Sequence, residues 1–246
     1  MISPTTTMIY FFILTSIYFL LKYYLAEKYS VKDNNALRIP LTIIYLVIML
    51  FIQTSVNIAN AREKCGGTPQ TLKAINYTIG PNLLIFGSML VVMMLFPGWK
   101  APFSNTIGYM VTLLGSVKTV FTSILKTDSN NKLLKAVYRD PSMMINEITP
   151  ENFNLFISRM GSSQNSILSS NYRDYLPDLY DLVVIKDKVA EFLWYILTGA
   201  LVIQNSHTYI MSIKCKRSED ELGAKLNKAL DNPKKEKKTE TWTVGY

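Results

Sequence analysis

The chain has 246 residues, of which 49% are hydrophobic, and carries a formal net charge of +8. Its apolar residues gather in blocks almost without charge, and charged residues lie between and after these blocks. This pattern is typical of a multi-spanning membrane protein and excludes a simple soluble domain. The basic residues flank the apolar blocks, so we attribute the positive charge to membrane topology and anionic lipid headgroups rather than to nucleic-acid binding.

The first two apolar segments, residues 8–25 and 39–58, are predicted to be transmembrane helices, because each is long enough to cross about 30 Å of hydrocarbon. No Lys or Arg precedes the first segment, which favours a retained span over a cleaved signal peptide. In the second segment, the spacing of Gln53, Asn57 and Asn60 places them on one helix face. Such a stripe is more typical of hydrogen bonding between helices than of a ligand site.

Two further spans are expected at residues 79–96 and 107–125. The first of these is without charge, so it has the composition of a lipid-exposed helix. The second mixes Gly, Ser and Thr with apolar residues and contains Lys118. It is therefore expected either to span the membrane or to lie against other helices near the surface.

A distinctive stretch, FPGWKAPFSNTIGY at residues 96–109, joins these two segments. Pro97 and Gly98 should end the preceding helix, and an indole such as that of Trp99 suits the boundary between lipid and water. We interpret the stretch as a rigid turn that sets the angle between its neighbours. Trp99 and Phe103 are candidate contacts with a partner.

Residues 126–188 are too polar for lipid and are predicted to form a small, mostly helical extramembrane module. Thr149 is followed by Pro and Glu, which is typical of a helix start. Residues 189–213 are the last predicted span. They are expected to continue one long helix that begins near Pro177, since neither Gly nor an interior Pro interrupts it before Gly199.

A charged tail, residues 214–246, completes the chain, and its Trp242 and Tyr246 are candidate docking residues. Five spans would place this tail and the 126–188 module on opposite sides of the membrane. The loops on the tail's side would carry more Lys and Arg, so that side is expected to be cytoplasmic or its equivalent. If residues 107–125 do not cross, every later segment changes sides.

The sequence contains no recognisable catalytic set, so we expect no enzyme activity, no cofactor and no metal. Cys65 and Cys215 have no partner spacing and suggest neither a zinc site nor a disulfide framework. The single histidine, His207, is more typical of a packing residue than of a ligand or base. Lys118 is a candidate contact that could reach the membrane surface or pair with an acid of the module. Asn76 lies in a formal glycosylation sequon close to an apolar segment.

The stretch from CGGTPQ, residues 65–70, through an apolar helix into PGWKAPFSNTIGY resembles a set of membrane proteins of large nucleo-cytoplasmic DNA viruses, including the chlorella-type algal viruses. The resemblance covers about residues 55–125. It implies a protein of the lipid membrane beneath an icosahedral capsid, present in many copies, that bridges this membrane and minor capsid proteins.

The sequence therefore predicts an all-α, multi-pass membrane protein with four or five spans. The expected function is structural, linking the internal membrane of a virion to its capsid, with host membranes as the location during assembly. The expected partners are the lipid bilayer and capsid or minor capsid proteins, without direct binding of nucleic acid. The alternatives are a small transporter or channel, and a membrane assembly factor that is not retained in the particle.

Overall fold

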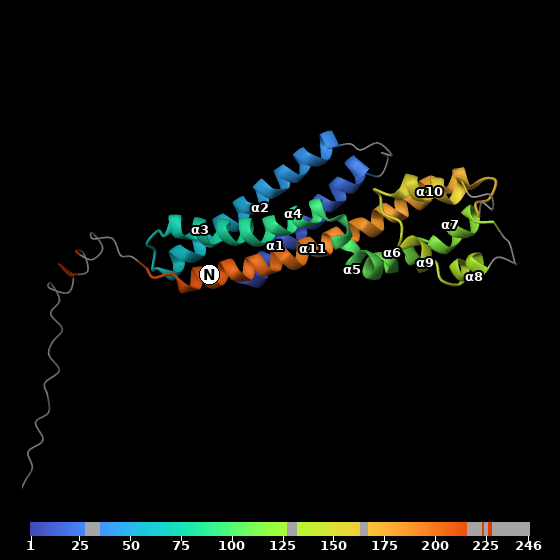
Figure 1. Ribbon diagram of the computed structural model, residues 1–246. Helices are drawn as coiled ribbons and strands as arrows, with labels where there is room; N and C mark the ends of the chain where they lie inside the picture. Colours follow the sequence, from blue (N-terminus) through green and yellow to red (C-terminus); the bar gives the residue numbers. More distant parts are fainter. Residues whose placement is uncertain (28–34, 127–131, 163–166, 216–222, 224–225, 228–246) are drawn as a thin grey trace, which may run out of the picture.

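The computed structural model describes residues 1–27, 35–126, 132–162, 167–215, 223 and 226–227. Over these residues the secondary structure is helical, apart from one isolated bridge between Leu125 and Leu168, so the all-α prediction is confirmed. The molecule is elongated, with a bundle of long helices at one end and a module of short helices at the other (Figure 1). One helix, α11, runs through both parts.

Three long apolar helices form most of the bundle. They are α1 (Pro4–Lys22), which continues as a π-helical turn, α2 (Asn35–Lys64), and α3 (Thr71–Pro81), which continues into α4 (Ser88–Leu95). All three are long and apolar enough to cross a membrane. They cover the first three predicted spans except Phe96, and each begins before the predicted start. The Ser3 side chain accepts a hydrogen bond from the Thr6 amide and caps α1.

Helix α11 (Leu176–Ser212) is unbroken over 37 residues, which confirms one long helix starting near Pro177. Its second half packs against α1, α2, α3 and the π-helical turn Asn82–Gly87. Close contact with α1 depends on Gly199, where an added Cβ would lie 2.1 Å from the ring of Phe11. Helix α11 is not among the helices that pass as candidate spans by length and composition. That residues 189–213 cross the membrane thus stays a prediction.

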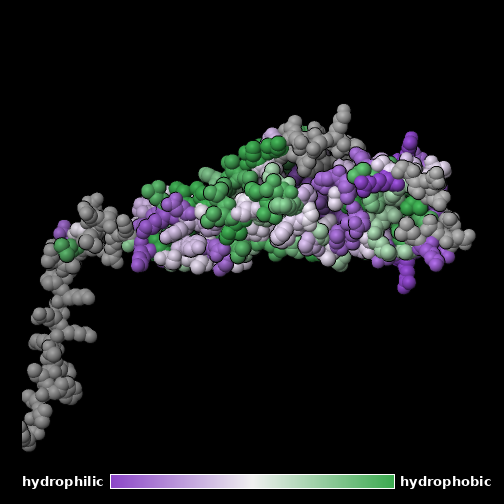
Figure 2. All heavy atoms as spheres, viewed as in Figure 1, coloured by the Kyte–Doolittle hydropathy of each residue, from purple (hydrophilic) through white to green (hydrophobic). Residues whose placement is uncertain are grey.

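The apolar side chains that face outward gather on the bundle, whereas hydrophilic and apolar residues are mixed on the module (Figure 2). Phe51, Leu84 and Met94 expose more than two thirds of their side chains at this surface. In water such a surface would be strongly unfavourable, but in a bilayer it would be in contact with lipid. The bundle is therefore compatible with a membrane location.

The predicted helix at 107–125 is wrong as a single element. The chain instead forms a run of short helical segments over 97–114, including α5 (Ala101–Phe103) and α6 (Tyr109–Leu114), followed by α7 (Val117–Ile124), which is bent from this run by 82°. Taken together, the two parts also pass as one broken or re-entrant candidate span by length and composition. Ser116 at the bend has a left-handed φ of 64°, a conformation that breaks a helix. The segment packs along the first half of α11, so the chain stays at the module end instead of returning through the bundle.

This path changes the predicted arrangement around a membrane. Four helical stretches, α1, α2, α3–α4 and the second half of α11, run along the bundle, so both its first and its last residues lie at the end remote from the module (Figure 1). The beginning of the tail is therefore beside the N-terminus and the α2–α3 turn. The module lies on the side of the turn at 97–106, not on the opposite side as the five-span arrangement required.

The module has a hydrophobic core of its own, formed by α7, α8 (Lys132–Arg139), α9 (Ser142–Ile145), α10 (Phe153–Ser162) and the start of α11. Phe121, Ile145 and Leu179 are each at most 1% exposed in it. Because α7 contributes to this core, the module begins near residue 117 rather than 126. Thr149 accepts a hydrogen bond from the Asn152 amide, and α10 begins just after this turn.

Candidate functional site

Five charged side chains meet where the bundle joins the module, and we name them the junction cluster. Each side chain is at most 13% exposed, although charged groups are normally found in water. Helix α1 supplies one member at its end, the turn after α4 supplies another, and α11 supplies three. The members are Lys22, Lys100, Asp187, Lys188 and Glu191.

Glu191 holds two ammonium groups. Lys22 donates a hydrogen bond of 2.6 Å to one carboxylate oxygen and Lys188 donates one of 2.8 Å to the other. The Lys22 ammonium also lies 5.6 Å from the ring centres of Tyr18 and Phe19, within range of a cation–π interaction. Since these side chains are at most 13% exposed, the pairs are screened little by solvent, and they tie the end of α1 to α11.

Asp187 provides the second centre of the cluster. The Lys100 ammonium lies 2.7 Å from its carboxylate and 3.8 Å from Glu151, a half-exposed acid of the module. Lys188 is 3.9 Å from Asp187 and so connects the two centres. The cluster thus joins α1, the turn after α4 and the module through the same two turns of α11.

Several residues of the distinctive stretch at 96–109 pack against α11. The Trp194 indole N–H donates to the Trp99 carbonyl at 3.2 Å, and the rings of Trp99 and Phe103 lie 6.0 and 5.1 Å from that of Trp194. A Cβ at Gly108 would lie 2.6 Å from the carbonyl oxygen of Lys186, so only glycine allows this approach. Trp99 remains 51% exposed, and a partner contact there stays a prediction.

Lys118 is exposed on α7, within the module, and therefore lies away from the bundle. Hydrogen bonds from the side chain and the amide of Ser142 lower the pKa of the Asp140 carboxyl, and the charge of Lys118 acts in the same direction. The pairing of Lys118 with an acid of the module stays a prediction. The candidate docking residues Trp242 and Tyr246 lie outside the described residues.

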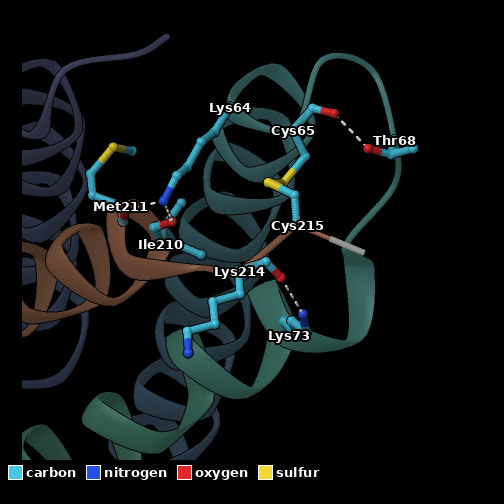
Figure 3. The surroundings of a disulfide bond; sticks show 8 residues. All are labelled: Lys64, Cys65, Thr68, Lys73, Ile210, Met211, Lys214 and Cys215. Atoms are coloured by element: carbon cyan, nitrogen blue, oxygen red, sulfur yellow. Dashed lines mark hydrogen bonds between the residues drawn. A yellow bond between two sulfur atoms is a disulfide. The ribbon is translucent and has the colours of Figure 1, made fainter. Parts of the chain in front are cut away.

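The sequence suggested no disulfide for the two cysteines, and the structure corrects this. Cys65 and Cys215 form a disulfide across a sequence separation of 150 residues (Figure 3). Lysines around it cap the end of α11: Lys64 donates to the carbonyls of Ile210 and Met211, and Lys73 donates to that of Lys214 at 2.7 Å. Cations at a helix C-terminus complement its dipole. The disulfide therefore closes the bundle at the end remote from the module.

Within the described part of the chain, no group of three or more His, Cys, Asp or Glu side chains could hold a metal ion. The junction cluster itself has its charges paired, so the chemistry that its geometry supports is the joining of helices. Comparison with protein-family models, curated proteins and solved structures finds no match.

Proposed function

We propose that this protein is a structural membrane protein of a virus particle that ties an internal membrane to the capsid shell. The observation that carries the proposal is the rigid coupling of an apolar bundle to a packed polar module. Unbroken α11 connects the two, and the ion pairs of Glu191 and Asp187 fasten α1 and the turn after α4 to it where the two parts meet. A linker between a bilayer and a shell needs such a coupling, because a flexible joint would not fix their spacing. The viral origin is supported by the resemblance of residues 55–125.

The module is the part that we assign to the capsid. It lies at the opposite end from the beginning of the tail, so the two would face opposite sides of a membrane. It also exposes Met143 and Leu155, each by more than half.

Photo-cross-linking in purified particles tests the assignment. A cross-linking amino acid at Leu155 should capture a capsid or minor capsid protein, whereas the same group at Leu84, on the apolar surface of the bundle, should capture lipid. Absence of the protein from particles, or failure of the Leu155 position to join any capsid protein, would contradict the proposal. Proteomics of mature particles also separates it from an assembly factor that is not retained.

The disulfide supports a sidedness for the proposed protein. Because disulfides persist in oxidising environments, we place the Cys65–Cys215 end on the oxidising side of a host membrane and the module on the reducing side. The turn at 97–106 and the turn between α2 and α3 keep the sides expected from the charges of the loops, whereas the module and the tail exchange theirs. In sealed vesicles from expressing cells, protease added outside should reach either the module or the tail, and the fragment that survives identifies the side of each.

A small channel or transporter is the second candidate, because the bundle contains buried amide side chains, among them Gln53 and Asn57. Flux in reconstituted liposomes that is lost in Gln53→Leu but kept in Lys118→Met would favour it. The structural role predicts no flux in either case.

A further inference from the structure

A layer of polar side chains lies inside the bundle near the disulfide end. Asn57 donates to the Thr78 hydroxyl at 2.8 Å, and Asn82 donates to the Gln53 side-chain oxygen at 2.8 Å. Asn60 exchanges two hydrogen bonds with the backbone of Ile2. These contacts confirm that the polar stripe of α2 serves hydrogen bonding between helices.

Three polar atoms of this layer have no hydrogen-bond partner among the described residues. They are Nε2 of Gln53, Oγ of Ser206 and Oδ1 of Asn82, whose residues are 4%, 1% and 6% exposed. Gln53 and Ser206 line a common pocket, and Asn82 is not part of its lining. A buried polar atom without a partner is unfavourable, and the surrounding apolar bundle makes it more so. The first atom is a donor and the second can donate or accept, so the two are complementary to the same small ligand.

Both side chains line the same pocket between α1, α2 and α11. The remaining walls are formed by Pro4, Thr7, Asn57, Ile203 and His207. The pocket has room for about one water molecule, and it offers the two or more polar partners that a buried water needs. An adjoining pocket is lined mostly by apolar side chains, such as Phe11 and Leu14, and offers fewer such partners.

We propose that the first pocket binds an ordered water molecule, which accepts a hydrogen bond from Gln53 Nε2 and forms a second with Ser206 Oγ. The amide N–H of Gln53 points to a ligand with a lone pair and disfavours a cation. The water completes the connection between α2 and α11 at a level where the protein offers no direct bond between these two side chains. The inference does not depend on the proposed function, since it concerns only the interior of the bundle.

The test is NMR of the full chain labelled with ¹⁵N-glutamine and reconstituted in nanodiscs. The sequence contains four glutamines, and the side-chain signal of Gln53 is assigned as the one lost in Gln53→Leu. A bound water should give a nuclear Overhauser cross-peak to the side-chain amide protons of Gln53. The sign of this cross-peak should be that of a long-lived contact. Gln204, exposed on α11, is the internal control and should show only rapid exchange with bulk water. A Gln53 amide without any contact to water would overturn the proposal.

A matched pair of variants tests the second partner. Ser206→Ala removes one hydrogen bond and should make the bound water exchange roughly fivefold faster, the ratio that corresponds to about 1 kcal/mol. Thr198→Ala, on the same helix but outside the pocket, should leave the exchange unchanged. If Ser206→Ala keeps the wild-type exchange rate, or Thr198→Ala changes it equally, the bridge to Ser206 is refuted.

Discussion

Replacement of Glu191 by Gln tests the junction cluster most directly. The change keeps the size of the side chain but removes the negative charge that Lys22 and Lys188 share at 2.6 and 2.8 Å. Lys188 would keep Asp187 at 3.9 Å, whereas Lys22 would have no other carboxylate of the described residues as a partner. A buried charge left without its partner costs about 3–5 kcal/mol. We therefore expect Glu191→Gln to lower the free energy of unfolding by about 3 kcal/mol or more.

Equilibrium unfolding by denaturant in detergent micelles measures this loss. The control is Glu63→Gln, because Glu63 pairs with the N-terminal amino group but is 59% exposed. Exposed pairs contribute at most about 1 kcal/mol, so this variant should stay close to wild type. Adding Lys22→Met to Glu191→Gln should restore part of the lost stability, since the unpaired charge is then gone. Equal losses for Glu191→Gln and Glu63→Gln would refute the buried character of the cluster.

Three further predictions concern other parts of the structure. Cys215→Ser should lower the free energy of unfolding by up to about 5 kcal/mol, since the disulfide closes a 150-residue loop. Reduction of the wild-type disulfide should lower it by the same amount. Gly199→Ala should cost about 1–3 kcal/mol through the clash with Phe11, whereas Gly80→Ala, with nothing within 4 Å, should stabilise by about 0.5–1 kcal/mol in thermal unfolding. Burial lowers the pKa of Lys186 from 10.5 to about 8, and nearby acids oppose this shift only in part. Between pH 8 and 10.5 the unfolded chain therefore binds more protons than the folded protein. Stability should rise from pH 8 to 10.5 in the wild type, and this rise should be absent in Lys186→Met.

The helices were predictable because their signals are local. The run of apolar residues before Leu95 and the lack of breakers after Pro177 are sufficient to indicate long helices, and the structure contains them. The spacing of Gln53 and Asn57 likewise predicted that they share an inward face. The break at Ser116 was missed, because an 82° bend depends on how α6 and α7 pack on α11.

The contacts between distant segments could not be predicted. Glu191 is 169 residues from Lys22, and their pairing requires α1 and α11 to run side by side with the right rotation. No pattern in one sequence records that rotation. The same reason explains why the disulfide was missed, and why the packing of Trp99 and Phe103 against Trp194 was not predicted.

The sequence by itself determined which stretches are helical and which are apolar enough for a bilayer, since periodicity and composition act over neighbouring residues. The tertiary structure alone decided that the segment after Pro97 stays beside α11, so that the module and the beginning of the tail lie at opposite ends. It also decided that Cys65 meets Cys215 and that five buried charges gather at one junction. These features depend on where helices cross, and a crossing is fixed by packing between residues far apart in the chain.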